Sequence, residues 1–399
     1  MNTLDSVNNL SREDVLSKME SFELLEHGLH KEKLVDYLNR VVGEALEENK
    51  ELGVIAALNN ADTDYVLLDI LKSDPSKVFQ GINIVSYAIG AEKRILYLPE
   101  SLKEFAKELT TAALEYNTEI KNGIVDVRAN RGCAVLHITT VADVADVFNN
   151  VYTSGVYVSV NGNAVKKVPY NTKISELIDI NKAKAILAGY KYLLPEEAEM
   201  TIEEAEVSNG ILKVLTDKEC VVSETEKRLL ECKKQSCGKC VFCREGLIQL
   251  QYMQKEITEG RGKSEYLDFT KEIGEAMRIS TSCTMGQASA EIALSAVSKI
   301  SEEYEVHIKK KNCPAGVCSS FVNIYIDPQL CDGCGECMDV CPKDCIEGKP
   351  KYIHMIDEFD CSKCGKCIEG CKAGAIIKTT GKLPKLPDRL IKVGKFRKR

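Results

Sequence analysis

The sequence predicts an α/β fold joined to α-helical and cysteine-rich parts, and three observations carry this prediction. Strand-like apolar runs alternate with helical patterns over residues 51–152, which is typical of parallel strands covered by helices. The Asn161-Gly162 pair lies between two runs of alternating polarity and predicts a hairpin in a small β-grasp-like module. Apolar residues at helical spacing follow over 223–304, and the residues beyond are rich in cysteine, glycine and charge.

The composition excludes several classes of protein. The chain has 399 residues, which is enough for two or three domains with a hydrophobic core. Apolar residues make up 44% and charged residues 28%, as in globular and unlike disordered proteins. The net charge of −7 argues against nucleic acid as a partner. No apolar run approaches the roughly 18 residues of a membrane span, so we expect no direct membrane insertion.

Eighteen cysteines are the most informative feature of the composition. Twelve of them fall into three C-x2-C-x2-C runs and three further matching positions, which leaves six outside any such pattern. In a secreted protein this number would suggest disulfides, but residues 1–60 contain no apolar stretch behind a basic start, so no signal peptide is expected. We therefore expect a reducing, cytoplasmic location and metal ligation by the twelve.

The pattern of apolar residues divides the chain into elements and domains. Residues 1–50 are predicted as a surface or docking helix, because Leu34, Leu38 and Leu46 recur at helical spacing. Strands are expected at 53–59, 65–71, 94–98, 125–127 and 134–138, and helices at 78–90, 101–116 and 174–180, with a connection at 182–189. The expected domains are a helical extension (1–50), an α/β domain (51–152), a β module with its connection (153–222), a helical bundle (223–304), a linker (305–324), a cysteine-rich domain (325–380) and a basic tail (381–399).

The bundle contains the first cysteine group, in the segment SCGKCVFCREG. Cys237, Cys240 and Cys243 are separated by two residues each, and Cys283 follows in TSCTMG. Three thiolates at this spacing can hold one face of a [4Fe–4S] cubane while the fourth comes from elsewhere in the chain. A structural zinc site is the alternative, but zinc knuckles supply their ligands in pairs. The spacing predicts a [4Fe–4S] cluster, and these four cysteines are called the cluster I set.

Two further runs have the spacing of bacterial ferredoxins with two clusters. C-x2-C-x2-C-x3-C-P begins at Cys331, and C-x2-C-x2-C-x3-C begins at Cys361, with Lys372 in place of the usual second proline. In this pattern the fourth cysteine of each run ligates the other cluster, and two zinc ions are the alternative. The cluster II set is therefore Cys331, Cys334, Cys337 and Cys371, and the cluster III set is Cys341, Cys361, Cys364 and Cys367.

These segments resemble a known family. SCGKCVFCREG with the distant TSC-x-MG resembles the cluster motif of the NADH-oxidising flavoprotein subunit of complex I and of the beta subunit of electron-bifurcating [FeFe] hydrogenases. Residues 67–98 are similar to the family's segment behind its flavin site, and 156–192 to its ubiquitin-like SLBB module. The resemblance covers about residues 50–380 and implies a degenerate complex-I-flavoprotein-like α/β domain, an SLBB (β-grasp) module, a helical bundle with a [4Fe–4S] cluster and a bacterial two-cluster ferredoxin domain.

The nucleotide-binding devices of that family are missing or altered. Its FMN lies on a glycine-rich loop of the type GRGGAGFPTG, and no comparable loop precedes residue 53. Asn60 and Asp62 resemble its N-A-D-E contact, with threonine in place of the acid, and Asn149-Asn150 match N-N-V-E-T, with tyrosine in place of glutamate. Residues 137–140 read HITT where the family has GEET. We expect no FMN; the alternative is weak FMN binding through Asn60, Asp62, Asn149 and Asn150, with the phosphate met by a partner chain.

The linker reads EVHIKKKNCPAGVC and resembles the stretch that precedes the ferredoxin module in the hydrogenase beta subunits. The resemblance implies a zinc ion held by His307, Cys313 and Cys318 with a fourth ligand from elsewhere. Buried thiols without a metal are the alternative. The remaining cysteines are expected to be small core residues, with Cys232 or Cys345 as the spare fourth ligand; they are Cys133, Cys220, Cys232 and Cys345.

No group of side chains in the sequence predicts catalysis. His27 and His30 are expected to be solvated on a helical surface, beside the charged Glu23 and Glu26. Residues 378–399 carry nine basic residues and one acidic residue, a net charge of +8. This extended tail is either solvated or a docking strip for an acidic partner surface.

Three clusters in one chain predict an iron–sulfur electron-transfer subunit of an oxidoreductase of anaerobic metabolism. We expect it to relay electrons between a partner flavoprotein or ferredoxin and a partner catalytic subunit, without a complete NADH and FMN site of its own. The alternative, which the resemblance alone suggests, is an NADH:acceptor oxidoreductase (diaphorase) subunit with its own FMN and NADH site. A cluster protein of nucleic-acid repair has little support from an acidic chain.

Overall fold

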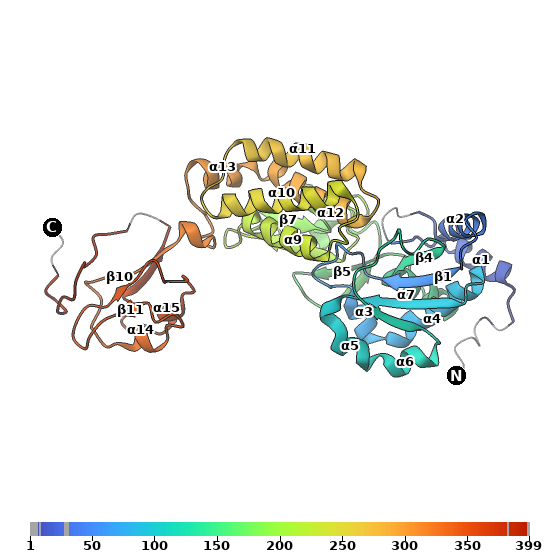
Figure 1. Ribbon diagram of the computed structural model, residues 1–399, viewed down its shortest axis with the longest axis horizontal. Helices are drawn as coiled ribbons and strands as arrows, with labels where there is room; N and C mark the ends of the chain where they lie inside the picture. Colours follow the sequence, from blue (N-terminus) through green and yellow to red (C-terminus); the bar gives the residue numbers. More distant parts are fainter. Residues whose placement is uncertain (1–6, 8, 28–31, 381–382, 397–399) are drawn as a thin grey trace. The chain divides into compact units, whose positions relative to one another are not determined.

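The computed structural model describes residues 7, 9–27, 32–380 and 383–396, and Figure 1 shows their helices and strands and labels many of them. The chain divides into two compact units. The first unit consists of Met1–Thr216, Lys227–Tyr252 and Asp268–Ile300. The second unit consists of Asp217–Glu226, Met253–Leu267 and Ser301–Arg399.

A parallel sheet forms the centre of the α/β part of the first unit. Its strand order is β3-β2-β1-β4, and every pair is parallel, as the alternation of strands and helices predicts. The strands are β1 (Gly53–Ala57), β2 (Lys93–Leu98), β3 (Glu119–Asn122) and β4 (Cys133–His137). All of β1 is buried, because helices cover a parallel sheet on both faces.

Two predicted strands of this domain are not strands. Residues 65–71 contribute instead to helix α3 (Leu68–Ser73), since a short apolar run does not distinguish a buried helix from a strand. Residues 125–127 form a loop, and the edge strand beside β2 is β3. The predicted helix at 101–116 is divided into η1 (Glu100–Leu102), α5 (Lys103–Glu108) and α6 (Thr110–Glu115).

Helices α4 (Pro75–Ile89) and α7 (Ile138–Phe148) pack directly against each other in this core. Helix α4 begins where the Asp74 carboxylate accepts a hydrogen bond from the Lys77 amide and ends at Gly90, which has φ of 72°. All residues of α7 are buried. The two backbones approach so closely that a Cβ atom at Gly81 would lie 1.8 Å from the Val141 carbonyl oxygen.

We expect Gly81→Ala to lower the free energy of unfolding by about 2–3 kcal/mol, because the added methyl group forces the two helices apart. Chemical denaturation measures this loss. Gly43→Ala is the matched control, since Gly43 lies in a helix and its Cβ would meet no atom within 4 Å. The control is expected to stabilise the protein by up to about 1 kcal/mol, because alanine favours a helix. Equal losses in both variants would contradict the packing argument.

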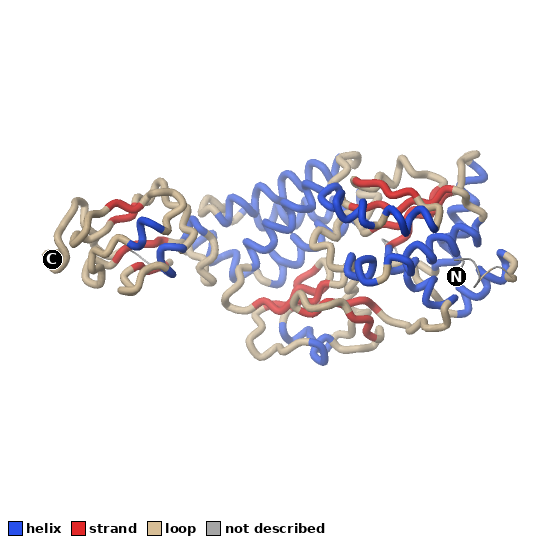
Figure 2. Tube along the Cα trace, turned by 90° about the horizontal axis from the view of Figure 1, so that it is seen from below, coloured by secondary structure: helices blue, strands red, loops and turns tan. Residues whose placement is uncertain are grey.

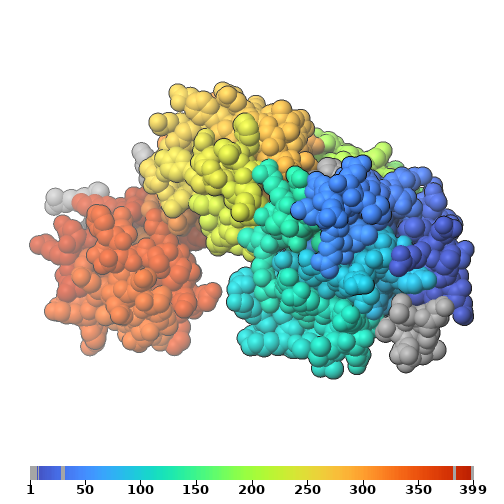
Figure 3. Space-filling view, turned by 45° about the vertical axis from the view of Figure 1, so that its right-hand side comes forward, coloured from blue at the N-terminus to red at the C-terminus, as the bar shows by residue number. Residues whose placement is uncertain are grey.

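The described residues among the first fifty do not form a separate docking helix, which corrects the sequence prediction. They contain α1 (Arg12–Ser21) and α2 (Leu34–Glu47), whose apolar residues Val15, Met19 and Leu38 are buried in the core of the α/β domain. In Figure 3 the blue surface of these helices is continuous with the cyan surface of the α/β domain. The apolar stripe of α2 is real, but it covers the chain's own domain.

The β module contains a mixed sheet in the order β6-β5-β9-β7-β8, drawn in red in Figure 2. Its elements are β5 (Val156–Val160), β6 (Lys166–Val168), α8 (Ile174–Leu177), β7 (Ala185–Ala188), β8 (Lys191–Leu193), η2 (Pro195–Glu199) and β9 (Ile211–Leu215). The predicted hairpin joins β5 to β6, and Asn161 and Gly162 have φ of 50° and 80°. The predicted connection at 182–189 contains β7, which corrects that expectation.

The predicted helical region consists of long helices with close contacts. They are α9 (Val221–Gln235), α10 (Val241–Thr258), α11 (Glu265–Ser280), α12 (Thr284–Lys299) and α13 (Ser301–Lys309). A Cβ atom at Gly246 of α10 would lie 2.3 Å from the Met277 sulfur of α11, so the two helices touch at this glycine. Helix α12 packs on β8, where the Tyr192 amide donates a 3.0 Å hydrogen bond to Ser295 Oγ. Within the described ranges, no helix combines the length and apolarity needed to cross a membrane.

The cysteine-rich part of the second unit has short elements around a core of sulfur and isoleucine. Its elements are η3 (Ser319–Phe321), β10 (Asn323–Ile326), α14 (Glu336–Asp339), β11 (Ile346–Glu347), β12 (Met355–Ile356), α15 (Lys366–Glu369) and β13 (Ile376–Thr379). Strand β10 pairs with β13 and β11 with β12, both antiparallel. Residues Ile391 and Phe396 of the basic tail pack on this core, so its described part is not simply solvated.

Candidate metal centres and the adjoining cavity

The cluster I set meets at the N-terminal ends of α10 and α12. Cys237 and Cys240 lie in the loop before α10, Cys243 lies in its first turn, and Cys283 is the residue before α12. The pKa of the Cys243 thiol is raised to about 11, mainly by burial and in addition by the nearby Cys283, Cys240 and Cys237. Cysteine binds a metal as the thiolate, so iron bound here would take the place of the thiol protons. The structure brings all four predicted residues together.

Hydrogen-bond donors surround this set. Arg128 Nη2 donates to Cys240 Sγ over 3.2 Å and to Ser282 Oγ over 3.5 Å. Burial raises the pKa of Cys283, while the backbone amide of Met285 in the first turn of α12 lowers it. Sequence reasoning missed Arg128, because it lies in a loop more than a hundred residues before the cysteines it contacts and has no motif of its own.

Two sites in the cysteine-rich domain have four predicted ligands each. One is lined by the cluster II set, Cys331, Cys334, Cys337 and Cys371. The other is lined by the cluster III set, Cys341, Cys361, Cys364 and Cys367. In each site the fourth cysteine comes from the other run, as the ferredoxin spacing predicts. Gly335 and Gly365, with φ of 91° and 81°, turn the backbone around the sites just before α14 and α15.

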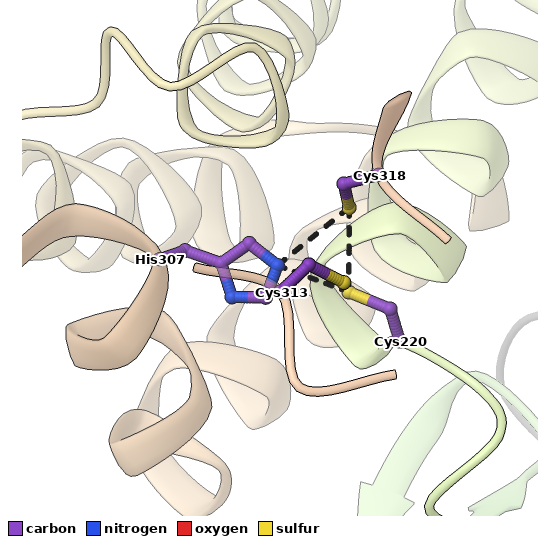
Figure 4. A group of neighbouring side chains, drawn as sticks. All are labelled: Cys220, His307, Cys313 and Cys318. Atoms are coloured by element: carbon purple, nitrogen blue, oxygen red, sulfur yellow. Dashed lines mark hydrogen bonds between the residues drawn. The ribbon is translucent and has the colours of Figure 1, made fainter. Parts of the chain in front are cut away.

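A fourth group contains Cys220, His307, Cys313 and Cys318, all buried, and is called the zinc set (Figure 4). Its ligand atoms all lie within 4.8 Å of one another. Nε2 of His307 is 3.3 Å from Cys220 Sγ and 3.6 Å from Cys318 Sγ. Nδ1 of His307 lies 2.8 Å from the Glu303 carbonyl oxygen and donates to it, which leaves Nε2 to face the sulfurs. Three thiolates and one imidazole form the Cys3His set of structural zinc sites.

The fourth member of this set corrects the sequence prediction. Cys220, expected to be a core residue, lies beside His307, whereas Cys232 is buried in α9 and Cys345 lies 3.5 Å from the Cys341 sulfur. The Val221 amide donates to Glu303 Oε1 over 2.9 Å, which joins the start of α9 to α13. Cys220 precedes His307 by 87 residues and belongs to no metal-ligand spacing, so the sequence alone did not single it out.

A cavity of about 390 Å³ adjoins the cluster I set within the first unit. It is bounded by Cys237, Cys240 and Cys283, by the carboxyl end of β1, by β4 along its length, and by α2. Of the four described residues in the alternative flavin set, only Asn60 lines it. The Asn60 side chain is already engaged, because Nδ2 donates to the Val125 carbonyl over 2.9 Å and Oδ1 accepts from the Val125 amide.

The other three members of the flavin set lie elsewhere. The buried Asp62 carboxylate accepts from Tyr190 and lies 3.0 Å from His137 Nε2. Asn149 forms two side-chain hydrogen bonds with Gln80, and Asn150 is exposed. The four residues therefore do not converge on one ligand, and the alternative FMN contacts do not fit the structure.

His27 and Glu26 are not solvated on a helix, which corrects another expectation. Helix α1 ends at Ser21, and Glu26 is buried with Oε1 accepting from the His137 amide over 2.8 Å. His27 Nε2 lies 3.3 Å from Asp143 Oδ2. Although burial opposes ionisation, His27 and Lys167 hold the pKa of Asp143 below its usual range. Glu23 is exposed as expected, and His30 lies outside the described residues.

Comparison with known proteins confirms the resemblance. Residues 225–307 match the NADH-ubiquinone oxidoreductase-F iron-sulfur binding region, and residues 324–347 match the 4Fe-4S binding domain. NADP-reducing hydrogenase subunit HndC of Solidesulfovibrio fructosivorans is 26% identical over 405 residues, covering 82% of this chain and 83% of HndC. The F subunit of the NADH-quinone oxidoreductase of Mycobacterium tuberculosis is 29% identical over 103 residues, which is 26% of this chain and 23% of that protein.

A solved structure shows the same fold. The crystal structure of NAD+-reducing [NiFe]-hydrogenase in the H2-reduced state matches with a TM-score of 0.63 and 17% identity, over 75% of this chain and 63% of that chain. The protein therefore has a mixed α/β fold of this kind, with iron–sulfur binding regions of the NADH-ubiquinone oxidoreductase-F and 4Fe-4S types. The first region contains the whole cluster I set, and the second contains Cys331, Cys334, Cys337, Cys341 and Cys345.

Proposed function

We propose that this chain is an iron–sulfur electron-transfer subunit of a multi-subunit oxidoreductase, with three [4Fe–4S] clusters and one structural zinc ion. The observation that carries the proposal is that twelve cysteines gather into three groups of four, inside or beside two matched iron–sulfur regions. Each group contains four cysteines at the spacing of cluster ligands, and four is the number of ligands that a cubane cluster takes from a protein. The bound iron would carry single electrons, and the chain's residues would fix the positions of the clusters and influence their reduction potentials.

The chain is proposed to work with partner subunits. HndC is by name a subunit of an NADP-reducing hydrogenase, and the mycobacterial relative is by name a subunit of an NADH-quinone oxidoreductase. By analogy, a partner flavoprotein or ferredoxin would supply electrons here, and a partner catalytic subunit would receive them. The mixed sheet, proposed as an SLBB module, and the basic tail are proposed as docking surfaces. Polar and basic side chains suit a surface that binds a partner electrostatically.

The absence of a flavin from this chain is part of the proposal. The contacts that the family resemblance suggested are engaged within the protein, since Asp62 binds His137 and Tyr190 and Asn149 binds Gln80. These hydrogen bonds satisfy the polar groups internally. The chain's own residues in this region would therefore hold the α/β domain and the β module together, within the first unit.

One observation favours a competing function, an NADH:acceptor oxidoreductase with its own FMN. The cavity beside the cluster I set includes the carboxyl end of β1, and parallel sheets commonly bind nucleotides at the carboxyl ends of their strands. A flavin there would exchange electrons directly with cluster I. The side chains of Asn60, Asp62 and Asn149 already form hydrogen bonds within the protein, which argues against this function.

The cofactor content after anaerobic purification distinguishes the two functions. Three [4Fe–4S] clusters require about 12 iron and about 12 sulfide per chain. The relay function predicts this content, no stoichiometric FMN and no oxidation of NADH by the isolated chain. One FMN per chain together with NADH oxidation would support the competing function. An iron content near eight or four would contradict the assignment of three clusters.

A further inference from the structure

The two cluster sites of the cysteine-rich domain differ by one sulfur. Five cysteines among the described residues line the cluster III site, because Cys345 is present beside the four expected ligands. Its sulfur lies 3.5 Å from Cys341 Sγ, within hydrogen-bonding distance for sulfur, and the residue is 5% exposed. A cubane cluster takes four protein ligands, so one of the five sulfurs has another role.

The domain contains its own comparison, because the two cysteine runs are related by an internal repeat. Cys345 follows Cys341 by four residues, and Ala375 follows Cys371 by four residues. Both positions are buried, both line their cluster site, and each is followed by the first residue of a strand, β11 or β13. A thiol therefore stands beside cluster III at the place where a methyl group stands beside cluster II.

The spacing identifies which sulfur is the additional one. Cys341 has the x3 spacing of the fourth ligand, and its counterpart Cys371 lines the other site in the equivalent way. Cys345 has no counterpart among the cysteines of the second run.

We propose that the S–H group of Cys345 donates a hydrogen bond to the ligand sulfur of Cys341, which raises the reduction potential of cluster III relative to the same site with alanine at position 345. The inference rests on the proposed function, because it requires clusters II and III to be present. Hydrogen bonds to ligand sulfurs are one of the means by which proteins set the potential of a cluster. The bond is strongest when the cluster is reduced, because the sulfurs then carry more negative charge.

The higher reduction potential proposed for cluster III favours location of the electron on cluster III. When reduced cluster II transfers one electron to oxidised cluster III, cluster II becomes oxidised and cluster III reduced, and no proton or other reactant is consumed. The thiol beside Cys341 stabilises the product of that transfer. The cluster II site also contains a histidine, His354, whose Nδ1 lies 3.9 Å from Cys331 Sγ. His354 is present in every variant proposed below, so it does not contribute to the differences between them.

The test is a redox titration of the full chain, purified anaerobically and monitored by EPR spectroscopy. In Cys345→Ala, the ratio of oxidised to reduced cluster III at a fixed potential should rise about threefold to tenfold, as expected for one lost hydrogen bond. In Ala375→Cys, the same ratio for cluster II should fall by a similar factor. Cys232→Ala, which removes a buried thiol in α9, is the control and should leave both ratios unchanged.

Iron analysis of each variant separates the possible failures. Unchanged potentials in Cys345→Ala with all iron retained would overturn the inference while leaving the proposed function intact. Loss of about four iron from Cys345→Ala would also overturn it, because Cys345 would then be a ligand. Iron already missing from the unmodified chain would instead defeat the proposed function.

Discussion

Replacing Cys220 with alanine is expected to release zinc and to destabilise the linker over 305–324. Cys220 is the member of the zinc set that comes from the start of α9, while the other three lie between His307 and Cys318. Loss of a residue that only hydrogen-bonds to a metal ligand weakens metal binding about 10- to 100-fold. Loss of a ligand itself should therefore weaken zinc binding by more than about 100-fold. Because the binding free energy of a structural zinc ion is also folding free energy, the melting temperature should fall with the metal content.

Metal analysis and calorimetry of two variants measure this effect. Cys232→Ala is the matched control, since Cys232 is also buried and lies in the same helix but outside the zinc set. It should retain one zinc ion per chain and lose about 1–2 kcal/mol of stability through its small cavity. Full retention of zinc by Cys220→Ala would rule out the assigned ligand set. Absence of zinc from the unmodified chain would favour buried thiols without a metal.

The cluster sites were predictable from the sequence because their ligands are local. Each C-x2-C-x2-C run names three cysteines of a group, and the x3 spacing names the fourth member in the two ferredoxin-like runs, whereas Cys283 was identified through the distant TSC-x-MG motif. No spacing motif in the sequence identified Cys220 of the zinc set or Arg128 beside the cluster I set, because each comes from a segment distant from the other residues of its site. The hairpin at Asn161-Gly162 was equally local, because positive φ at both residues favours that dipeptide.

The errors in the fold have a common physical cause. The apolar stripe of α2 shows that one face is buried, but it does not show which surface covers that face. The same limitation applies to His27 and Glu26, whose partners Asp143 and His137 are more than a hundred residues away. Burial of a charged residue depends on a partner that folding provides, and the local sequence does not reveal that partner.

Replacing Cys283 with alanine is expected to remove cluster I and to leave clusters II and III in place. Cys283 is the only member of its set that is distant in sequence from the other three, and it lies in the first unit, whereas the ferredoxin-like runs lie in the second. Without this sulfur one iron corner has no protein ligand, and neither Thr281 nor Ser282 can supply a thiolate. The iron content should fall from about 12 to about 8 per chain, and one EPR signal should disappear.

Ser282→Ala is the control for this prediction, because Ser282 adjoins Cys283 and contacts Arg128 without being a ligand. Its iron content should stay near 12. If cluster I relays electrons from the partner flavoprotein or ferredoxin to clusters II and III, the Cys283→Ala variant should also reduce clusters II and III more slowly. With an added low-potential donor, the rate of their reduction should fall by at least about tenfold. Loss of all three EPR signals in Cys283→Ala would mean that the units do not hold their clusters independently. Retention of all three would remove Cys283 from the ligand set and with it the assignment of the cluster I site.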